Sequence, residues 1–136
     1  MIVLVDTDVL IDVALGRAGF TESAGALLDA LEQRSATGYV AWHTISNFYY
    51  LVRPNRGRND TKQFVLELLS FMDVAPTSTD ALRYAANLEM SDFEDAMQVA
   101  AAIGCHADFI ATRNIPDYAR SPIKAALPSD VVAMLG

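Results

Sequence analysis

The sequence predicts an α/β fold of three layers, in which helices cover both faces of a mostly parallel central sheet of about four to five strands. Short apolar runs typical of buried strands alternate with segments of helical periodicity along the whole chain. The first run, residues 2–5, is apolar and β-branched throughout, as expected for a strand buried on both faces of a parallel sheet. No internal repeat interrupts this order.

The composition limits the class of protein. The 136 residues fit a single domain, which we expect to span residues 1–136. A formal charge of −7 argues against a basic nucleic-acid coat protein, but it leaves a nuclease open because divalent cations offset a local acid cluster. Because no apolar run is long enough for a membrane span and Cys105 is the single cysteine, we expect a cytoplasmic protein without internal disulfides.

The remaining elements follow from local signals. Thr7 or Asp8 is expected to cap a first helix, and Ser91 with Glu94 has the spacing of a capping box for a later one. The expected elements after the first helix are, in order, a helix at 21–34, a strand at 39–41, a helix at 43–52 that Pro54 ends, a helix at 61–72, a strand at 74–75, helices at 79–88 and 92–103, strands at 108–111 and 125–127, and a last helix from 128.

Two surface features are open to more than one interpretation. Residues 53–60 are expected to form a basic, turn-rich loop, which with Lys62 is either a grip on RNA phosphates or a solvated loop. Trp42, Tyr49 and Tyr50 could stack on bases, but their helical spacing favours core positions or an interface between two copies.

Four carboxylates form the candidate site. Asp6 ends the first strand, at the sheet edge where open α/β folds place ligands. Asp92 and Asp95 share one face of a helix start, and Asp117 follows the fourth strand. Two of them have a simpler explanation on their own: Asp92 complements the helix dipole, as does Glu94, and Asp117 is a turn residue after Pro116. Asp95 lies one step further into the helix and is less needed as a cap. Asp8 alone is best explained as a helix cap.

Together, carboxylates at one sheet edge indicate a site for a hard cation. Oxygen ligands suit Mg²⁺ or Mn²⁺ rather than zinc, and His43 and His106 are too few for a zinc motif. Such a cation activates water and stabilises charge on a phosphodiester. A phosphatase or other hydrolase on a doubly wound sheet is a weaker alternative, because no phosphate-cradling loop is present.

Three segments resemble PIN-domain proteins, namely residues 5–12, residues 92–102 followed by 107–114, and residues 121–128. The resemblance implies a metal-dependent endoribonuclease, most often the toxin of a VapBC-type toxin–antitoxin pair. It implies Asp6 and Asp95 as metal ligands. The family usually has a further acid after the fourth strand. In this chain Asn114 lies nearest to that position, and Asp117 is the carboxylate that could take the role of the further acid.

The resemblance also implies partners and one departure. The expected cofactor is Mg²⁺ or Mn²⁺, and the expected partners are an RNA substrate, a small basic antitoxin and a second copy of the chain. The catalytic set is then Asp6, Asp95, Asp117 and Asn114, with Asp92 in support. Many family members carry a Glu in the helix after the second strand, where this chain has Ser46 and Asn47. The alternative is therefore a weakened or inactive PIN-like module that binds RNA or a protein.

Overall fold

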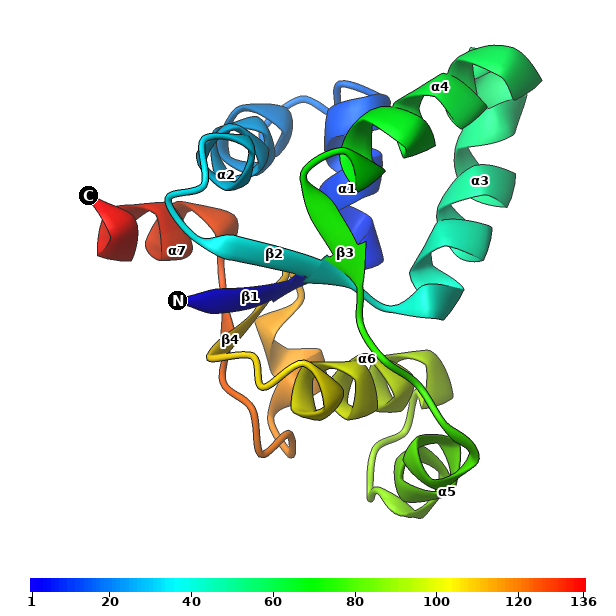
Figure 1. Ribbon diagram of the computed structural model, residues 1–136, viewed down its shortest axis with the longest axis vertical. Coiled ribbons are helices and arrows are strands. Elements are labelled where there is room, and N and C mark those ends of the chain that lie inside the picture. Colours follow the sequence, from blue (N-terminus) through cyan, green and yellow to red (C-terminus); the bar gives the residue numbers. More distant parts are fainter.

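The computed structural model describes residues 1–136 and confirms the predicted α/β fold (Figure 1). Its elements are β1 (Ile2–Val5), α1 (Thr7–Ala14), α2 (Thr21–Glu32), β2 (Thr37–Val40), α3 (Trp42–Arg56), α4 (Arg58–Leu69), β3 (Met72–Val74), α5 (Thr79–Asn87), α6 (Phe93–Gly104), β4 (Phe109–Ala111), the 3₁₀ helix η1 (Ile115–Tyr118), β5 (Ala125–Ala126) and α7 (Pro128–Leu135). The sheet has five strands in the order β3-β2-β1-β4-β5. All four pairings are parallel.

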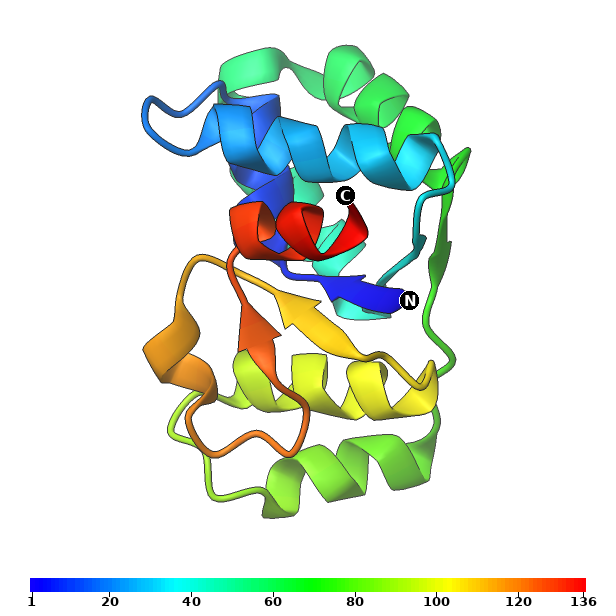
Figure 2. The same ribbon diagram turned by 90° about the vertical axis from the view of Figure 1, so that its left-hand side faces the viewer.

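Helices cover both faces of this sheet. Val3 and Val5 of β1 belong to the larger core cluster, which packs against α1, α2, α3, α4 and α7. Leu4 points to the other face and packs in a cluster with residues of α6. Helix α5 lies outside α6, and small alanine side chains fill their contact. Figure 2 shows the two helical layers on opposite sides of the strands.

The central position of β1 places its end beside that of β4. Val5 is paired with Ala111 in parallel register, and the amide of Asp6 donates a hydrogen bond of 2.9 Å to the Ala111 carbonyl. The residues that follow these two strands therefore leave the sheet at the same edge. No helix combines the length and apolar character that a membrane span requires.

The structure corrects the expected loop at residues 53–60. Helix α3 continues through Pro54 to Arg56, and α4 begins at Arg58. Tertiary contacts explain why one missing amide hydrogen bond does not end the helix at the proline: the rings of Phe48 and Phe64 stack 5.4 Å apart between α3 and α4. The basic residues therefore lie on two helices and at their junction.

Several local expectations were also wrong. Strand β3 begins at Met72, because the side chain of Met72 is buried beside Gly38 of β2. Helix α6 is capped by Asp92, not by Ser91. Trp42 and Tyr50 are 47% and 62% exposed, so they are not core residues, and their place in an interface between two copies stays a prediction. The helix predicted over 79–88 is confirmed to within one residue, and so is the strand predicted over 125–127. The single cysteine, Cys105, is buried.

Candidate active site

An acid-lined pocket of about 330 Å³ opens at the carboxyl ends of β1 and β4. Its lining includes the four residues predicted from the sequence as catalytic, namely Asp6, Asp95, Asp117 and Asn114. The other lining residues are Thr7, Asp8, Ile11, Arg17, Leu51, Asp92 and Glu94. The parallel register thus brings together acids that lie about a hundred residues apart in the chain, at the edge where open parallel sheets place their ligands.

Asp6 occupies the floor of this pocket. It follows β1 directly and is itself the N-cap of α1, because its Oδ1 accepts a 2.7 Å hydrogen bond from the Thr7 amide. Its Oδ2 accepts hydrogen bonds from the hydroxyls of Thr112 at 2.9 Å and Tyr118 at 2.8 Å. Burial raises the pKa of Asp6, although these hydrogen bonds oppose the rise. The cap predicted from the sequence, Thr7 or Asp8, is therefore wrong by one or two residues.

Asp95 stands opposite Asp6, in the first turn of α6. Asp92 caps this helix, and its Oδ1 accepts a 3.1 Å hydrogen bond from the Asp95 amide. The side chain of Asp95 is thereby directed away from the cap and into the pocket, where its Oδ1 lies 3.3 Å from the Tyr118 hydroxyl. Burial, followed by the charges of Asp92, Asp6 and Asp117, raises the pKa of Asp95 to about 7.

Asp8 has a larger part in the site than the sequence suggested. Its Oδ2 accepts hydrogen bonds from the Asn114 side-chain amide at 2.8 Å, the Thr112 hydroxyl at 3.2 Å and the Arg113 amide at 3.3 Å. Burial and the charge of Asp6 raise the pKa of Asp8 to about 7. Asp8 therefore fastens α1 to the segment after β4 and does not act as a simple helix cap. The side chain of Asn114 thus hydrogen-bonds to Asp8 and not to Asp6.

Asp117 and the helix α3 define the rim. Asp117 lies exposed on η1, lines the pocket, and contributes to the raised pKa of Asp95 through its charge. From α3, only Leu51 lines the pocket. Ser46 instead lines a separate apolar groove between α3 and α4, and Asn47 lines neither. Helix α3 therefore contributes no acid to the pocket, in agreement with the missing Glu noted in the sequence.

One basic side chain borders the acids. Arg17, in the connection between α1 and α2, is the only basic residue among those that line the pocket. Its Nη1 lies 3.6 Å from Oδ1 of the buried Asp12. Asp12 also pairs with Arg113 at 3.0 Å, and the guanidinium of Arg113 lies 4.2 Å from the centre of the Phe20 ring. Arg17 is therefore held at the pocket by a fixed anionic partner.

A buried polar network supports the pocket from below. The Gln98 side-chain amide of α6 donates to the Thr44 hydroxyl of α3 at 2.8 Å and to Thr7 of α1 at 3.4 Å, and Thr7 donates to Thr44 at 3.1 Å. Burial lowers the pKa of His43, which favours the neutral imidazole and adds no positive charge near Asp6. Three helices that carry site residues are thus tied together beneath the carboxylates.

The donor set suits a hard cation that keeps much of its water. No group of three or more His, Cys, Asp and Glu side chains is close enough to hold a metal ion by itself. Mg²⁺, however, is usually held by about one or two carboxylates together with water and substrate oxygens. Asp6 and Asp95 supply such a pair, because both lie within hydrogen-bond distance of one hydroxyl. Burial raises the pKa values of both acids, and charged neighbours add to the rise, so a cation held between them would stabilise their ionised forms.

A PIN-domain family model matches residues 2–116, which is most of the chain. The chain belongs to the PIN-domain family. This PIN domain finds no match in a comparison with curated protein sequences.

Several solved structures share its fold. VapBC2 from Rickettsia felis, bound to a promoter DNA fragment, has a TM-score of 0.72 at 17% identity and covers 93% of this chain and 98% of that chain. FitAcB from Neisseria gonorrhoeae has a TM-score of 0.65 at 20% identity, with 93% and 97% covered. VapC20 from Mycobacterium tuberculosis, a toxin that cleaves the sarcin–ricin loop, has a TM-score of 0.63 at 12% identity, with 79% and 86% covered. At these identities the likeness concerns the fold.

Proposed function

We propose that this PIN domain is a Mg²⁺- or Mn²⁺-dependent endoribonuclease and the toxin of a toxin–antitoxin pair. The single observation that carries the proposal is the approach of Asp6 and Asp95 to one shared hydroxyl in an acid-lined pocket. Family membership supports the same conclusion, as does the likeness to VapC20, a toxin that cleaves RNA in the sarcin–ricin loop.

Each side chain has a role in this proposal. Asp6 and Asp95 would hold the cation, with Asp117 as a supporting acid at the open rim. When bound, the cation makes a water nucleophilic at neutral pH and offsets charge on the phosphodiester. Asn114 fixes Asp8 and, through it, the end of β4. Arg17 stands where it can pair with a backbone phosphate of RNA beside the acids.

More distant phosphates would meet the basic residues of the α3–α4 junction. Arg56 is partly committed to the fold, since it pairs with Asp60 at 2.7 Å and donates to the Ala14 carbonyl. Arg53, which lies 5.6 Å from the centre of the exposed Tyr50 ring, and Arg58 are free to contact the substrate.

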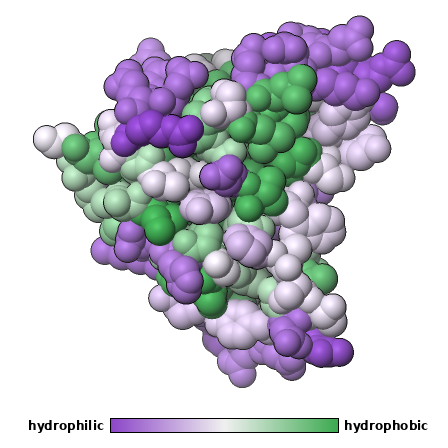
Figure 3. Space-filling model, viewed as in Figure 1, coloured by the Kyte–Doolittle hydropathy of each residue, from purple (hydrophilic) through white to green (hydrophobic).

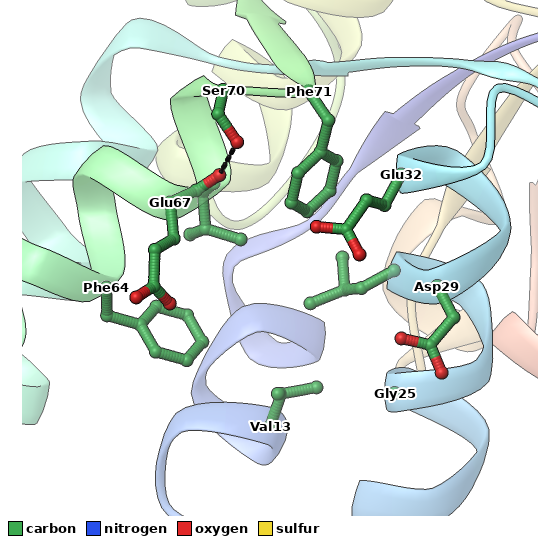
Figure 4. A pocket seen from close by; sticks show the side chains of 10 residues that line it. Val13, Gly25, Asp29, Glu32, Phe64, Glu67, Ser70 and Phe71 are labelled. Atoms are coloured by element: carbon green, nitrogen blue, oxygen red, sulfur yellow. Dashed lines mark hydrogen bonds between the residues drawn. The ribbon is translucent and has the colours of Figure 1, made fainter.

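The antitoxin is the second partner in this proposal, and the groove in Figure 4 is its proposed docking site. This groove has a volume of about 260 Å³, and its floor is formed by apolar residues that include Phe64 and Phe71. Asp29 and Glu32 of α2 face Glu67 of α4 across it. An apolar floor with an acidic rim complements the small basic partner predicted from the family. A predicted second copy of the chain would use a different surface, the α3–α4 groove with Trp42 and Tyr50.

The test is cleavage of varied RNAs with added Mg²⁺ or Mn²⁺, by wild type beside Asp6→Asn and Asp95→Asn. Each substitution removes one anionic ligand and should lower the cleavage rate by about a hundredfold or more. Asp130→Asn, which changes an acid on α7 outside the pocket, is the control and should cleave like wild type. Circular dichroism confirms that each variant is folded.

One observation favours a second candidate, namely a PIN-like module that binds RNA or a protein without cutting. Helix α3 brings no acid into the pocket. If wild type shows no metal-dependent cleavage and calorimetry detects no Mn²⁺ binding, the nuclease proposal is rejected in favour of this module.

A further inference from the structure

Tyr118 stands between the two carboxylates that would hold the cation. It is the last residue of η1, and it is only 4% exposed. Its hydroxyl lies 2.8 Å from Asp6 Oδ2 and 3.3 Å from Asp95 Oδ1. No other side chain makes a hydrogen bond to both acids. The sequence predicts a role for its neighbour Asp117 but none for Tyr118.

The hydrogen bonds of Asp6 show why this hydroxyl matters to a cation. A carboxylate oxygen has about two lone-pair sites. Both lone-pair sites of Asp6 Oδ2 accept a hydrogen bond, one from the Thr112 hydroxyl and one from the Tyr118 hydroxyl. Asp6 and Asp95 would hold a cation, and one that takes a lone pair of this oxygen would have to replace one of the two donors.

Tyr118 is the donor that a cation would replace. The Thr112 hydroxyl is fully buried and also lies within hydrogen-bond distance of Asp8 and the Asn114 amide. Its loss would disturb the segment after β4. The hydrogen-bond partners of the Tyr118 hydroxyl are the two acids alone, one oxygen of each.

We propose that the Tyr118 hydroxyl is a placeholder for the cation, which holds Asp6 and Asp95 together in the metal-free protein and gives up its hydrogen bond when a divalent cation binds. The inference rests on the proposed metal site and adds to it a residue that sets metal affinity. Tyr118 is thus a positioning residue that competes with the cation for the same oxygens.

The decisive variant is Tyr118→Phe, which keeps the ring and removes the hydroxyl. Without metal, the variant should unfold at a lower temperature than wild type, because two neighbouring carboxylates lose their shared donor. Mn²⁺ should bind it about tenfold more tightly, because a hydrogen bond to a charged group no longer has to be broken. With saturating Mn²⁺ the difference in stability should disappear. A purely structural hydrogen bond would leave that difference unchanged.

Calorimetric titration with Mn²⁺ and thermal unfolding with EDTA or excess Mn²⁺ measure these quantities. Tyr39→Phe is the matched control, since it removes the hydroxyl of a half-buried tyrosine outside the pocket and should leave Mn²⁺ affinity unchanged. A second measurement needs no variant: in wild type with ¹³Cζ-labelled tyrosine, Mg²⁺ should shift the NMR signal of Tyr118 and not that of Tyr39.

The outcomes separate this inference from the proposed function. If Tyr118→Phe binds Mn²⁺ equally or more weakly than wild type, or if Mg²⁺ leaves the Tyr118 signal in place while it binds, the placeholder is refuted and the metal site stands. If wild type binds neither cation, both the placeholder and the metal-dependent nuclease are refuted.

Discussion

Single side chains at the end of β1 combine structural and chemical roles. Asp6 ends a strand, caps α1 and accepts three hydrogen bonds, so its position is fixed from several directions. Asp95 is held by fewer contacts and owes its raised pKa to burial and to surrounding acids. A buried acid cluster of this kind opposes folding when it is ionised, which makes the stability of the metal-free protein depend on pH.

The pH dependence of stability can be tested with Asp95→Asn. In the folded protein the pKa of Asp95 is about 7, against 3.8 as its ordinary value. Between these pH values the folded state keeps a proton that the unfolded state releases, so stability falls as pH rises through this range. Asparagine cannot ionise. In EDTA, Asp95→Asn should therefore melt at a higher temperature than wild type at about pH 8, with the difference shrinking towards about pH 4.

Asp130→Asn, an acid on α7 away from the pocket, serves as the control for a change of one charge. Parallel melting curves for wild type and Asp95→Asn across this pH range would contradict the raised pKa of Asp95.

The predictability of the site differs from residue to residue. Asp6, Asp95 and Asp117 could be selected from the sequence because parallel strands end at a common sheet edge. The roles of Tyr118 and Asp8 could not, because they depend on the direction in which η1 and the segment after β4 turn back to the pocket. The one signal for Asp8 was its place two residues after Asp6, and a helix cap explained it equally well.

Among the secondary-structure elements, the junction of α3 and α4 departs most from expectation. Rules for isolated helices end α3 at Pro54, whereas packing between the two helices extends it to Arg56. Strand and helix order was predictable because hydrophobic periodicity records which face is buried. The junction was not, since it depends on contacts between residues of different helices.

Gly57 is the residue that this junction requires. Its φ of 84° and ψ of 160° lie in a region that only glycine adopts readily. Gly57→Ala should therefore lower the free energy of unfolding by about 1–3 kcal/mol. Gly25→Ala is the matched control, because Gly25 lies within α2, where an added Cβ meets no atom within 4 Å. It should raise the free energy of unfolding by about 0.5–1 kcal/mol.

Equilibrium urea unfolding measures both changes. Equal effects of the two alanine substitutions would show that the conformation of Gly57 imposes no strain.

For the molecule as a whole, charge is distributed unevenly over the surface. The net charge is −7, and acids gather both in the pocket and around the groove of Figure 4. Figure 3 shows, by contrast, an apolar area over α4 and β3, where Leu66, Leu69 and Val74 are exposed. A small basic partner would thus find a complementary rim at one groove, whereas the apolar area offers no charge to guide it.

This distribution predicts how a basic antitoxin is recognised. In the double variant Glu32→Lys with Glu67→Lys, like charges would meet across the interface, so the affinity for the proposed small basic antitoxin should fall by about tenfold or more. Glu22→Lys is the control, because it reverses an acid on the same helix α2 that does not line the groove. Surface plasmon resonance of the purified proteins gives the affinities, and raising the salt concentration should weaken wild-type binding more than that of the double variant. Equal affinities for all three chains would place the basic partner elsewhere on the surface, and the acidic rim would then have no part in its recognition.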